Sequence, residues 1–484
     1  MTTTLGNLYP GQSLIHFTGT YTDLYQLTMA QVYFLHGRQH DPATFDYFFR
    51  QLPFEGGYAV FAGLEDLLES LENLRFDPGD LAFLREQGFG AEFLHYLQDF
   101  RFTGTIYSVG EGDVVFPTRP ILRVEANLIE AQIIETLALN ILNFQTLIAT
   151  KASRMRLVAG DRTLVDFGLR RAQGVGGYYA SRAAMIGGFE GTSNVRVGRD
   201  FNTPVSGTMA HSFVQGYDDE LAAFRDFAES RPDDCVLLVD TYNTLASGIP
   251  NAIQVGKEME SRGQRLKGIR LDSGDLAYLS KKARQRLDEA GLNYVKIAVS
   301  NQLDEKLIKS LLQQEAPIDI FGVGTKLVIG YPDAALDGVY KLANVNEKPR
   351  IKLSESIDKV TLPGKKQVYR MLNGDGSFMG ADAVALADEK SHDIAVMHHP
   401  FDPLKSMTIR DCKKEPLLLK VMEHGKRTGS ALTLQSIAAY SRQRLGKLPG
   451  EYKRFENPHL YKVGLSDQLK LERDQLIAQY QKRK

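Results

Sequence analysis

The stretch LKGIRLDSGD, residues 266–275, carries the pattern that decides the fold: a short apolar run ends in charged and polar residues, and a helix-like segment (276–291) follows. Similar runs recur as TLVDFG (163–168), SGTMAHSF (206–213), CVLLVD (235–240), YVKIAVSN (294–301) and IDIFGVGT (318–325), with further helix-like segments at 252–263 and 303–315. This repetition is typical of parallel βα units. Runs such as VLLV do not alternate because parallel strands are buried on both faces. The sequence therefore predicts an α/β fold.

The polar residues of these units fall where the predicted strands end. In a closed (β/α) barrel, the carboxyl ends of the strands form the rim on which active sites lie. A doubly wound sheet would also bind ligands at these ends, so the site prediction does not depend on closure. The predicted rim consists of Asp166, His211, Asp240, Arg270, Asp272, Ser300, Asn301, Gly324 and Thr325.

Outside this region the pattern differs. The sequence predicts helices at 20–37 and 63–74, a strand at 43–53, short strands within 102–125 and a long apolar helix at 127–160. After about residue 335 we expect hairpins at 339–356 and 366–389, and a helical tail from 436 onward. These changes divide the chain into regions 1–125, 126–335 and 336–484.

Composition excludes several classes of protein. The 484 residues are 43% hydrophobic and 24% charged, with a formal net charge of −1. This balance lacks the excess of positive charge that is typical of proteins that bind nucleic acid or a membrane surface. Cys235 and Cys412 are the only cysteines, so a disulfide framework is excluded. The N-terminal sequence lacks the pattern of a secretory signal, and no apolar stretch reaches 18 residues without charge. We expect a cytoplasmic protein.

Two of the rim motifs contain groups suited to phosphate chemistry. His211 is either a structural histidine or a base or phosphoryl nucleophile. Arg170 and Arg171 follow Asp166-Phe167-Gly168, and adjacent arginines fit an anionic ligand, although a structural salt bridge is the alternative for Arg170. The Asp-Phe-Gly triplet is a weak match to kinases, because neither a G-x-G-x-x-G loop nor a His-Arg-Asp catalytic loop is present. The Walker A pattern is absent too.

The segments IRLDSGD (269–275) and FGVGTKL (321–327) are the most informative. The first combines a guanidinium, two carboxylates, a hydroxyl and a glycine in one strand-to-helix turn, which suits sugar hydroxyls, Mg²⁺ and phosphate. The second offers two glycines before a threonine, so the backbone can approach a phosphate closely. The residues alone thus indicate an enzyme that acts on phosphorylated sugars with Mg²⁺, and leave the reaction open.

The order of six motifs resembles the nicotinate phosphoribosyltransferases. They are TDLYQ (22–26), DFGLRRAQG (166–174), GGFEGTSN (187–194), GTMAHSF (207–213), RLDSGD (270–275) and FGVGT (321–325), and the likeness extends over roughly residues 20–430. The resemblance implies synthesis of nicotinate mononucleotide and pyrophosphate from nicotinate and phosphoribosyl pyrophosphate. This step of NAD biosynthesis would be coupled, in a ligase-type reaction, to hydrolysis of ATP to ADP and phosphate. It further implies an irregular (β/α) barrel beside an α/β sandwich-like domain built from N-terminal and later segments.

The resemblance also implies roles for individual residues. His211 would be phosphorylated by ATP. Nicotinate would bind at Tyr25, Phe167, Thr208, Arg270 and Ser193, with Phe167 stacked on one face of the pyridine ring and Tyr25 covering the other from the partner subunit of a homodimer. Arg170 would meet anionic groups near the reacting centre. Phosphoribosyl pyrophosphate would bind at Asp272, Ser273, Gly274, Gly324 and Thr325. Mg²⁺ would assist; its ligands stay open, with Asp240 and Asp272 as candidates for indirect contacts.

Several alternatives remain at this stage. Related nicotinamide phosphoribosyltransferases carry Asp where this chain has Ser193. An Asp carboxylate would repel the carboxylate of nicotinate and would accept a hydrogen bond from the amide of nicotinamide. Its absence here therefore favours nicotinate. A quinolinate phosphoribosyltransferase needs a more basic pocket, and a sugar-phosphate aldolase needs a Schiff-base lysine, for which Lys326 is the only candidate beside the rim segments. A non-catalytic sensor of phosphoribosyl pyrophosphate is a further possibility.

Overall fold

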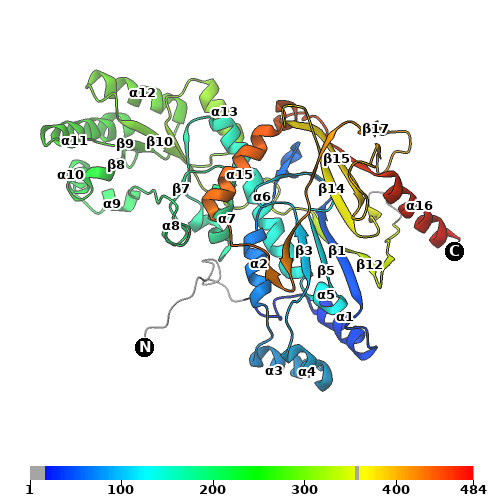
Figure 1. Ribbon diagram of the computed structural model, residues 1–484. Coiled ribbons are helices and arrows are strands. Elements are labelled where there is room, and N and C mark those ends of the chain that lie inside the picture. Colours follow the sequence, from blue (N-terminus) through cyan, green and yellow to red (C-terminus); the bar gives the residue numbers. More distant parts are fainter. Residues whose placement is uncertain (1–16, 355–358, 483–484) are drawn as a thin grey trace. The chain divides into compact units, whose positions relative to one another are not determined.

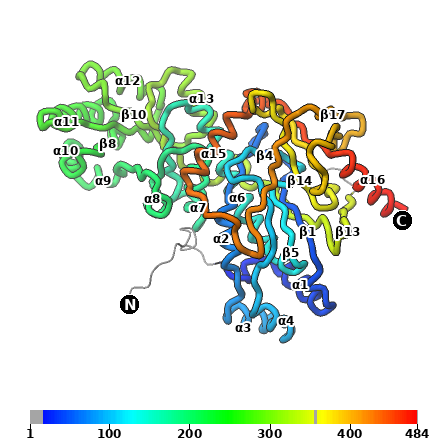
Figure 2. Tube along the Cα trace, in the orientation of Figure 1, coloured from blue at the N-terminus to red at the C-terminus, as the bar shows by residue number. Residues whose placement is uncertain are grey.

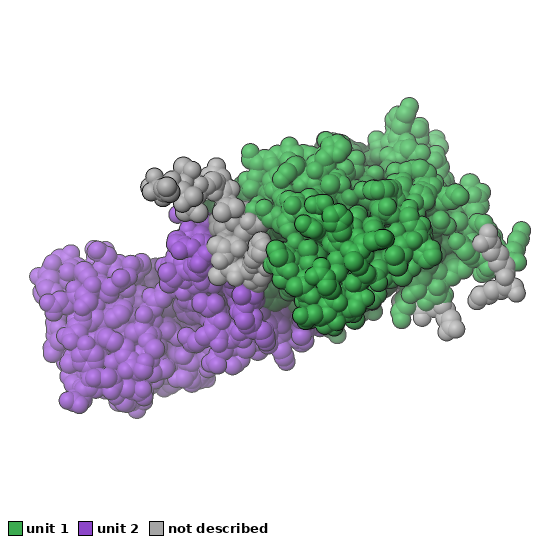
Figure 3. Space-filling model, turned by 90° about the horizontal axis from the view of Figure 1, so that it is seen from below, with its two compact units in different colours: residues 1–150, 335–484 green, residues 151–334 purple. Residues whose placement is uncertain are grey.

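The computed structural model describes residues 17–354 and 359–482, and its chain forms two compact units. Unit 1 comprises residues 1–150 and 335–484, and unit 2 comprises residues 151–334 (Figure 3). Unit 1 thus combines both ends of the chain, and the central third forms unit 2, as the colours of Figure 2 show. The three regions expected from the sequence have their first boundary at 125/126, whereas the first unit continues to residue 150.

Unit 2 contains a six-stranded parallel sheet in the order β7-β6-β11-β10-β9-β8 (Figure 1). The strands are β6 (Thr163–Asp166), β7 (Gly191–Thr192), β8 (Val236–Leu238), β9 (Gly268–Leu271), β10 (Lys296–Ser300) and β11 (Ile320–Val323). Among the described residues no ladder joins the edge strands β7 and β8. The strands of the expected irregular barrel therefore form a sheet that hydrogen bonds do not close. The prediction of an α/β fold is confirmed.

Helices connect these strands and begin soon after each strand ends. They are α7 (Gly176–Ile186), α8 (Val195–Phe201), α9 (His211–Gln215), α10 (Glu220–Ser230), α11 (Ile249–Ser261), α12 (Leu276–Glu289), α13 (Glu305–Gln313) and α14 (Thr325–Val328), with short turns at η3 (Leu169–Arg171), η4 (Pro232–Asp234) and η5 (Thr244–Gly248). Asp275 caps α12 by accepting from the Tyr278 N–H, and Asp304 caps α13 through the Leu307 N–H. Such caps satisfy amides that lack partners within the helix.

One predicted strand of unit 2 is wrong. Residues 206–210 belong to no strand, and only an isolated bridge joins Val205 to Thr192. Pro204 lacks a ladder donor and Gly207 has no side chain to pack, so this segment is a poor strand. His211 consequently lies at the start of α9 instead of at a strand end.

Unit 1 is built on an antiparallel sheet, a mixed sheet and a small pair of strands. The seven-stranded sheet has the order β13-β12-β1-β5-β3-β19-β20, the six-stranded sheet has the order β17-β16-β21-β15-β14-β18, and β2 pairs with β4. The strands are β1 (Pro42–Phe49), β2 (Ala59–Val60), β3 (Thr105–Ser108), β4 (Val114–Val115), β5 (Leu122–Asn127), β12 (Gly338–Val345), β13 (Lys348–Pro349), β14 (Lys366–Leu372), β15 (Phe378–Leu386), β16 (Val396–His398), β17 (Ser406–Thr408), β18 (Lys413–Pro416), β19 (Leu419–Glu423), β20 (Lys426–Arg427) and β21 (Lys462–Leu465).

Helices complete unit 1, and a large core of buried apolar side chains lies between them and the first sheet. They are α1 (Leu24–Leu35), α2 (Leu64–Asn73), α3 (Pro78–Glu86), α4 (Ala91–Gln98), α5 (Leu128–Ile133), α6 (Glu135–Ala159), α15 (Leu434–Lys447) and α16 (Asp467–Gln481), with short turns at η2 (Pro53–Glu55) and η7 (Gly450–Lys453). The last residues of α6 belong to unit 2.

Most of the elements that the sequence predicts for unit 1 are present, whereas α3, α4 and the strands β16 to β20 are not among the predictions. The long helix expected at 127–160 is interrupted at Ile134 into α5 and α6. The hairpin at 366–389 is β14 with β15. Within the segment 339–356, β12 and β13 form the other expected hairpin, with Val345 opposite Lys348, and residues 355–356 of that segment lie outside the described residues. The helical tail contains an unpredicted strand, β21, which pairs in parallel with β15. None of the described helices is long and apolar enough to span a bilayer.

Candidate active site

Arg270, at the centre of β9, organises the ends of the parallel strands. Its Nε donates to the Ser300 hydroxyl at 2.9 Å, and its Nη1 donates to the Thr208 hydroxyl at 3.1 Å and the Met209 carbonyl at 3.3 Å. Nη2 donates to Asp272 Oδ1 at 3.1 Å. Only 9% of Arg270 is exposed. A nearly buried guanidinium with a fixed set of acceptors is a preorganised anion-binding group.

Phe167 presents an aromatic ring beside this guanidinium. It directly follows β6, and its N–H donates to the Val323 carbonyl of β11. The ring centroid lies 5.4 Å from the Arg270 Cζ. The ring also covers Gly322, where an added Cβ would lie only 2.4 Å from it, so a glycine is required there. Together Phe167 and Arg270 offer a flat apolar face next to a positive charge.

Two aspartates and a serine follow the neighbouring strands. Asp240 Oδ2 accepts from the Asp272 N–H at 2.8 Å and from the Ser273 hydroxyl at 2.7 Å. Asp240 Oδ1 is buried and has no hydrogen-bond partner within the described part of the chain. Gly274, with φ at +76°, turns the chain toward the cap of α12. These groups place hard oxygen acceptors and a hydroxyl beside the guanidinium.

His211 lies on the other side of Asp272. Its Nδ1 is 3.1 Å from the Thr241 hydroxyl, and its Nε2 is 3.8 Å from Asp272 Oδ2. The side chain is 39% exposed, so a ligand can reach it. The imidazole is therefore oriented by a hydroxyl and faces a carboxylate, which suits a nucleophile or base.

Asp166 ties two loops together beneath the site. Oδ2 accepts from the hydroxyls of Ser181 at 2.6 Å and Thr192 at 2.7 Å, and Oδ1 accepts from the Gly168 N–H at 2.8 Å. The Asp166 carbonyl accepts from the Ser193 N–H at 2.8 Å. Burial raises the pKa of the Asp166 carboxyl, and these hydrogen bonds oppose that rise. Asp166 thus fixes the start of the loop of Phe167 relative to Ser193.

Gly324 and Thr325 form the turn from β11 into α14. An added Cβ at Gly324 would be 3.4 Å from the Phe167 carbonyl oxygen, so this turn lies against the backbone of Phe167. The neighbouring Lys326 Nζ donates to Asp304 at 2.6 Å. An ammonium held by a carboxylate is a poor Schiff-base nucleophile, which weakens the aldolase alternative.

The structure brings most of the predicted residues together, but not all. Phe167, Thr208, Arg270, Asp272, Ser273 and His211 are linked through the contacts above, and Ser193 joins them through Asp166. Arg170 is exposed on η3, and within residues 17–354 and 359–482 its side chain forms no ion pair or hydrogen bond. Tyr25 belongs to unit 1, where it is 50% exposed on α1. Partial burial, followed by the charges of Glu135 and Asp23, raises the pKa of its phenol.

Sequence reasoning missed the hydroxyls that orient the site. Thr241, Ser181 and Thr192 each hold a functional or loop-bearing group, yet single hydroxyl residues have no recognisable spacing. It left the metal ligands open beyond Asp240 and Asp272 as indirect candidates, and the described residues contain no group of three His, Cys, Asp or Glu side chains suited to one metal ion.

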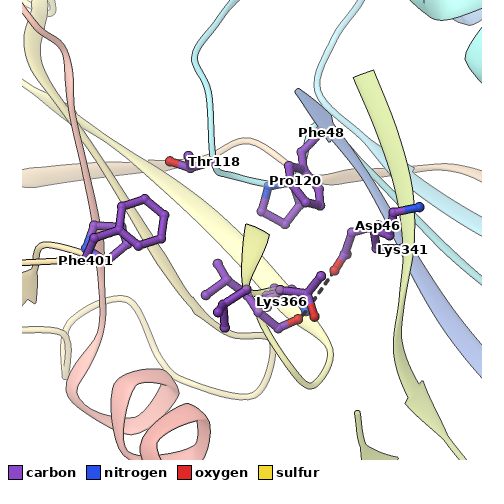
Figure 4. A pocket seen from close by; sticks show the side chains of 11 residues that line it. Asp46, Phe48, Thr118, Pro120, Lys341, Lys366 and Phe401 are labelled. Carbon is purple, nitrogen blue, oxygen red and sulfur yellow. Dashed lines mark hydrogen bonds and ion pairs between the residues drawn. The ribbon is translucent and has the colours of Figure 1, made fainter. Parts of the chain in front are cut away.

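A pocket in unit 1 contains none of the predicted site residues (Figure 4). Its walls include Phe48, Pro120 and Phe401, and Asp46 pairs there with Lys366 at 2.8 Å. Lys366 also donates to three backbone carbonyls, so its ammonium is fully used within the fold. Burial raises the pKa of Asp46 and lowers that of Lys366. We interpret this pair as a structural link between β1 and β14.

The fold and site define an α/β enzyme whose strand ends hold an arginine, carboxylates and a histidine around an aromatic ring. Comparisons with known proteins specify the family. The family model described as "Nicotinate phosphoribosyltransferase (NAPRTase) family" matches residues 162–373, and the models of the corresponding N-terminal and C-terminal domains match residues 20–143 and 365–471. The chain belongs to the nicotinate phosphoribosyltransferase family.

Individual relatives agree over almost the whole chain. The nicotinate phosphoribosyltransferase of Bacillus subtilis (strain 168) is 47% identical over 455 residues, which is 92% of each chain. That of Mycobacterium tuberculosis (strain H37Rv) is 41% identical over 458 residues, covering 94% of this chain and 93% of the relative. The crystal structure of human nicotinic acid phosphoribosyltransferase superimposes with a TM-score of 0.85 at 32% identity, covering 94% of this chain and 99% of the human chain.

Proposed function

We propose that this chain joins nicotinate to the ribosyl group of phosphoribosyl pyrophosphate and releases pyrophosphate, with ATP hydrolysis coupled to the reaction. Family membership supports the reaction class. The observation that carries the assignment to this site is the Arg270 guanidinium, fixed by four hydrogen bonds and lying 5.4 Å from the centroid of the Phe167 ring. A planar aromatic acid needs such a pairing of a flat face with a cation.

At the pyridine end, the ring of nicotinate would stack on Phe167, and its carboxylate would meet Arg270 and Thr208. Stacking contributes alignment, because the weakly nucleophilic ring nitrogen must be held in line with the anomeric carbon. At Ser193 this chain lacks the carboxylate that the related nicotinamide enzymes carry and that would repel this substrate. That difference favours nicotinate over nicotinamide, the alternative acceptor.

At the ribosyl end, Asp272 and Ser273 would bind the sugar, and Gly274, Gly324 and Thr325 would bind phosphate oxygens. Displacement of pyrophosphate at the anomeric carbon breaks its C–O bond and forms the C–N bond to nicotinate, with positive charge developing on the ribose. The carboxylates of Asp240 and Asp272 favour that charge, and Arg170 is exposed and free to meet the leaving pyrophosphate.

His211 would couple ATP to this reaction. With its Nδ1–H donating to Thr241, the Nε2 lone pair would attack the γ-phosphorus of ATP, so that a P–N bond forms, a P–O bond breaks and ADP leaves. Water would later release phosphate and restore the imidazole. A phosphoryl group here adds negative charge within reach of Asp272, which would change how the site holds pyrophosphate.

Mg²⁺ fits this site as a companion of the phosphates. It prefers oxygen ligands and usually keeps waters and substrate oxygens, so it needs only one or two carboxylates from the protein. Asp240 and Asp272 would supply these, and the buried Asp240 Oδ1 has no protein partner within the described residues. When bound, the ion would neutralise charge on the phosphates.

We further propose a homodimer in which Tyr25 completes the partner's nicotinate site. Support comes from α1, where Leu24, Val32 and Leu35 are exposed together with Tyr25, by 54–64% for the three aliphatic residues. Exposed apolar side chains on one helix indicate a surface that binds another protein. Sedimentation at several concentrations of wild type and Leu24→Lys tests this: a Leu24-dependent dimer supports it, and a wild-type monomer contradicts it.

The reaction is tested by incubating the protein with Mg²⁺, phosphoribosyl pyrophosphate and nicotinate, with and without ATP, and separating mononucleotide from pyrophosphate. We expect both products in equal amounts, and more of them with ATP. Binding of phosphoribosyl pyrophosphate without either product would instead identify a sensor.

A further inference from the structure

Ser300, the last residue of β10, bonds to both of the charged groups that flank the site. Its hydroxyl accepts from Arg270 Nε at 2.9 Å and donates to Asp272 Oδ1. Ser300 is 4% exposed. A serine hydroxyl donates once and accepts twice, so this single group satisfies a cation and an anion at the same time.

The parallel register places Ser300 between these two groups. β10 runs beside β9, with Ala298 opposite Arg270 and Val299 opposite Leu271, so Ser300 continues the row toward Asp272. On its other side Ser300 is opposite Gly322 of β11, the glycine covered by the Phe167 ring. Ser300 is thus the middle member of a row that runs from the aromatic wall to the carboxylates.

The backbone after Ser300 is strained. Asn301 and Gln302 both have positive φ, at +87° and +48°, a region that residues other than glycine rarely occupy. Such conformations persist where the surrounding structure requires them, and they cluster at functional sites. Here the two strained residues directly follow Ser300, the last residue of β10, whose hydroxyl bonds to Arg270 and Asp272.

We propose that Ser300 is a positioning residue that holds Arg270 and Asp272 in one fixed arrangement, so that the nicotinate carboxylate and the ribose are bound in register. The inference rests on the proposed function of this site. Without the hydroxyl, Arg270 Nε has no acceptor and Asp272 Oδ1 loses one donor. The contact of Arg270 with the nicotinate carboxylate and the contact of Asp272 with the ribose would then become less well ordered. Misplacing reacting groups by about 1 Å can cost about 100-fold in rate.

The test compares Ser300→Ala, Ser300→Thr and a matched control, Ser261→Ala, which removes one serine hydroxyl hydrogen bond at the exposed end of α11. For Ser300→Ala we expect KM for nicotinate to rise and kcat to fall together, giving a roughly 10- to 100-fold loss in kcat/KM. Ser300→Thr, which keeps the hydroxyl, should recover most of it, and Ser261→Ala should match wild type. A solely structural role would lower the melting temperature of Ser300→Ala and leave the constants of its folded fraction unchanged.

A crystal structure of Ser300→Ala separates this inference from the proposed function. A guanidinium displaced from its wild-type position supports the positioning role even if another acceptor replaces nicotinate. An unmoved Arg270 with wild-type kinetics overturns it. Wild-type protein that makes no nicotinate mononucleotide contradicts the proposed function alone, and the position of Arg270 then decides the role of Ser300.

Discussion

Replacing Arg270 by lysine should nearly abolish activity with nicotinate without unfolding the protein. The arginine makes four hydrogen bonds, to Ser300, Thr208, Met209 and Asp272, and lies over the Phe167 ring. A lysine ammonium is a single point charge and cannot reproduce the planar fork. We take two of the four hydrogen bonds as lost, at about 1.5–3 kcal/mol each for charged partners, which gives about 3–6 kcal/mol in all.

At least half of that loss should appear in catalysis, because the same fork must meet the substrate carboxylate. About 3 kcal/mol corresponds to a fall of roughly 100-fold in kcat/KM. Steady-state formation of nicotinate mononucleotide measures it, with circular dichroism to verify folding.

Arg265→Lys is the matched control, since Arg265 also lies over an aromatic ring, that of Tyr294 at 4.9 Å, on the exposed surface of unit 2. It should stay within about twofold of wild type, as exposed substitutions usually do. A folded Arg270→Lys variant with the kcat/KM of wild type would refute the assignment of Arg270 to the nicotinate carboxylate.

Three further predictions follow from the same contacts. His211→Ala should eliminate ATP hydrolysis and the stimulation of product by ATP, measured as ADP release; stimulation retained in the variant would contradict a phosphohistidine. Ser193→Asp should lower kcat/KM for nicotinate by about tenfold or more through like-charge repulsion and raise the nicotinamide-to-nicotinate ratio, with Ser261→Asp as control; an unchanged ratio would remove Ser193 from specificity. Asp166→Asn should lose a pH dependence. Because burial raises the Asp166 pKa, the wild type loses stability relative to the variant as pH rises from below 3.8 through that raised pKa. Urea unfolding at a series of increasing pH values should show a shrinking wild-type advantage, and a growing advantage would contradict the sign.

The parallel sheet of unit 2 was predictable because each strand has an unmistakable local pattern. GIRL before DSGD and IFGV before GTKL are apolar runs that end in turn and cap residues, and the structure places β9, α12, β11 and α14 there. The hydrogen bonds among Arg270, Asp272, Asp240 and Ser300 then follow from register, because parallel strands bring their carboxyl ends together.

The rest depended on contacts that no local pattern encodes. His211 was expected at a strand end, yet the segment before it contains Pro204 and Gly207 and forms a loop that leads into α9. β21 lies in the segment for which the sequence predicts a helical tail, because its strand character depends on pairing with β15 some 80 residues earlier in the chain. Thr241 and Ser181 act only through neighbours distant in sequence, so their side chains gave no signal.

The most direct test of the central claim is the ratio of kcat/KM for nicotinate to that for nicotinamide in the wild-type protein, measured with Mg²⁺, ATP and phosphoribosyl pyrophosphate. The Arg270 guanidinium beside Phe167, together with the absence of a carboxylate at Ser193, predicts a strong preference for nicotinate, about 10- to 100-fold, because one charge-assisted contact is worth about 1.5–3 kcal/mol. Equal use of the two substrates, or a preference for nicotinamide, would contradict it.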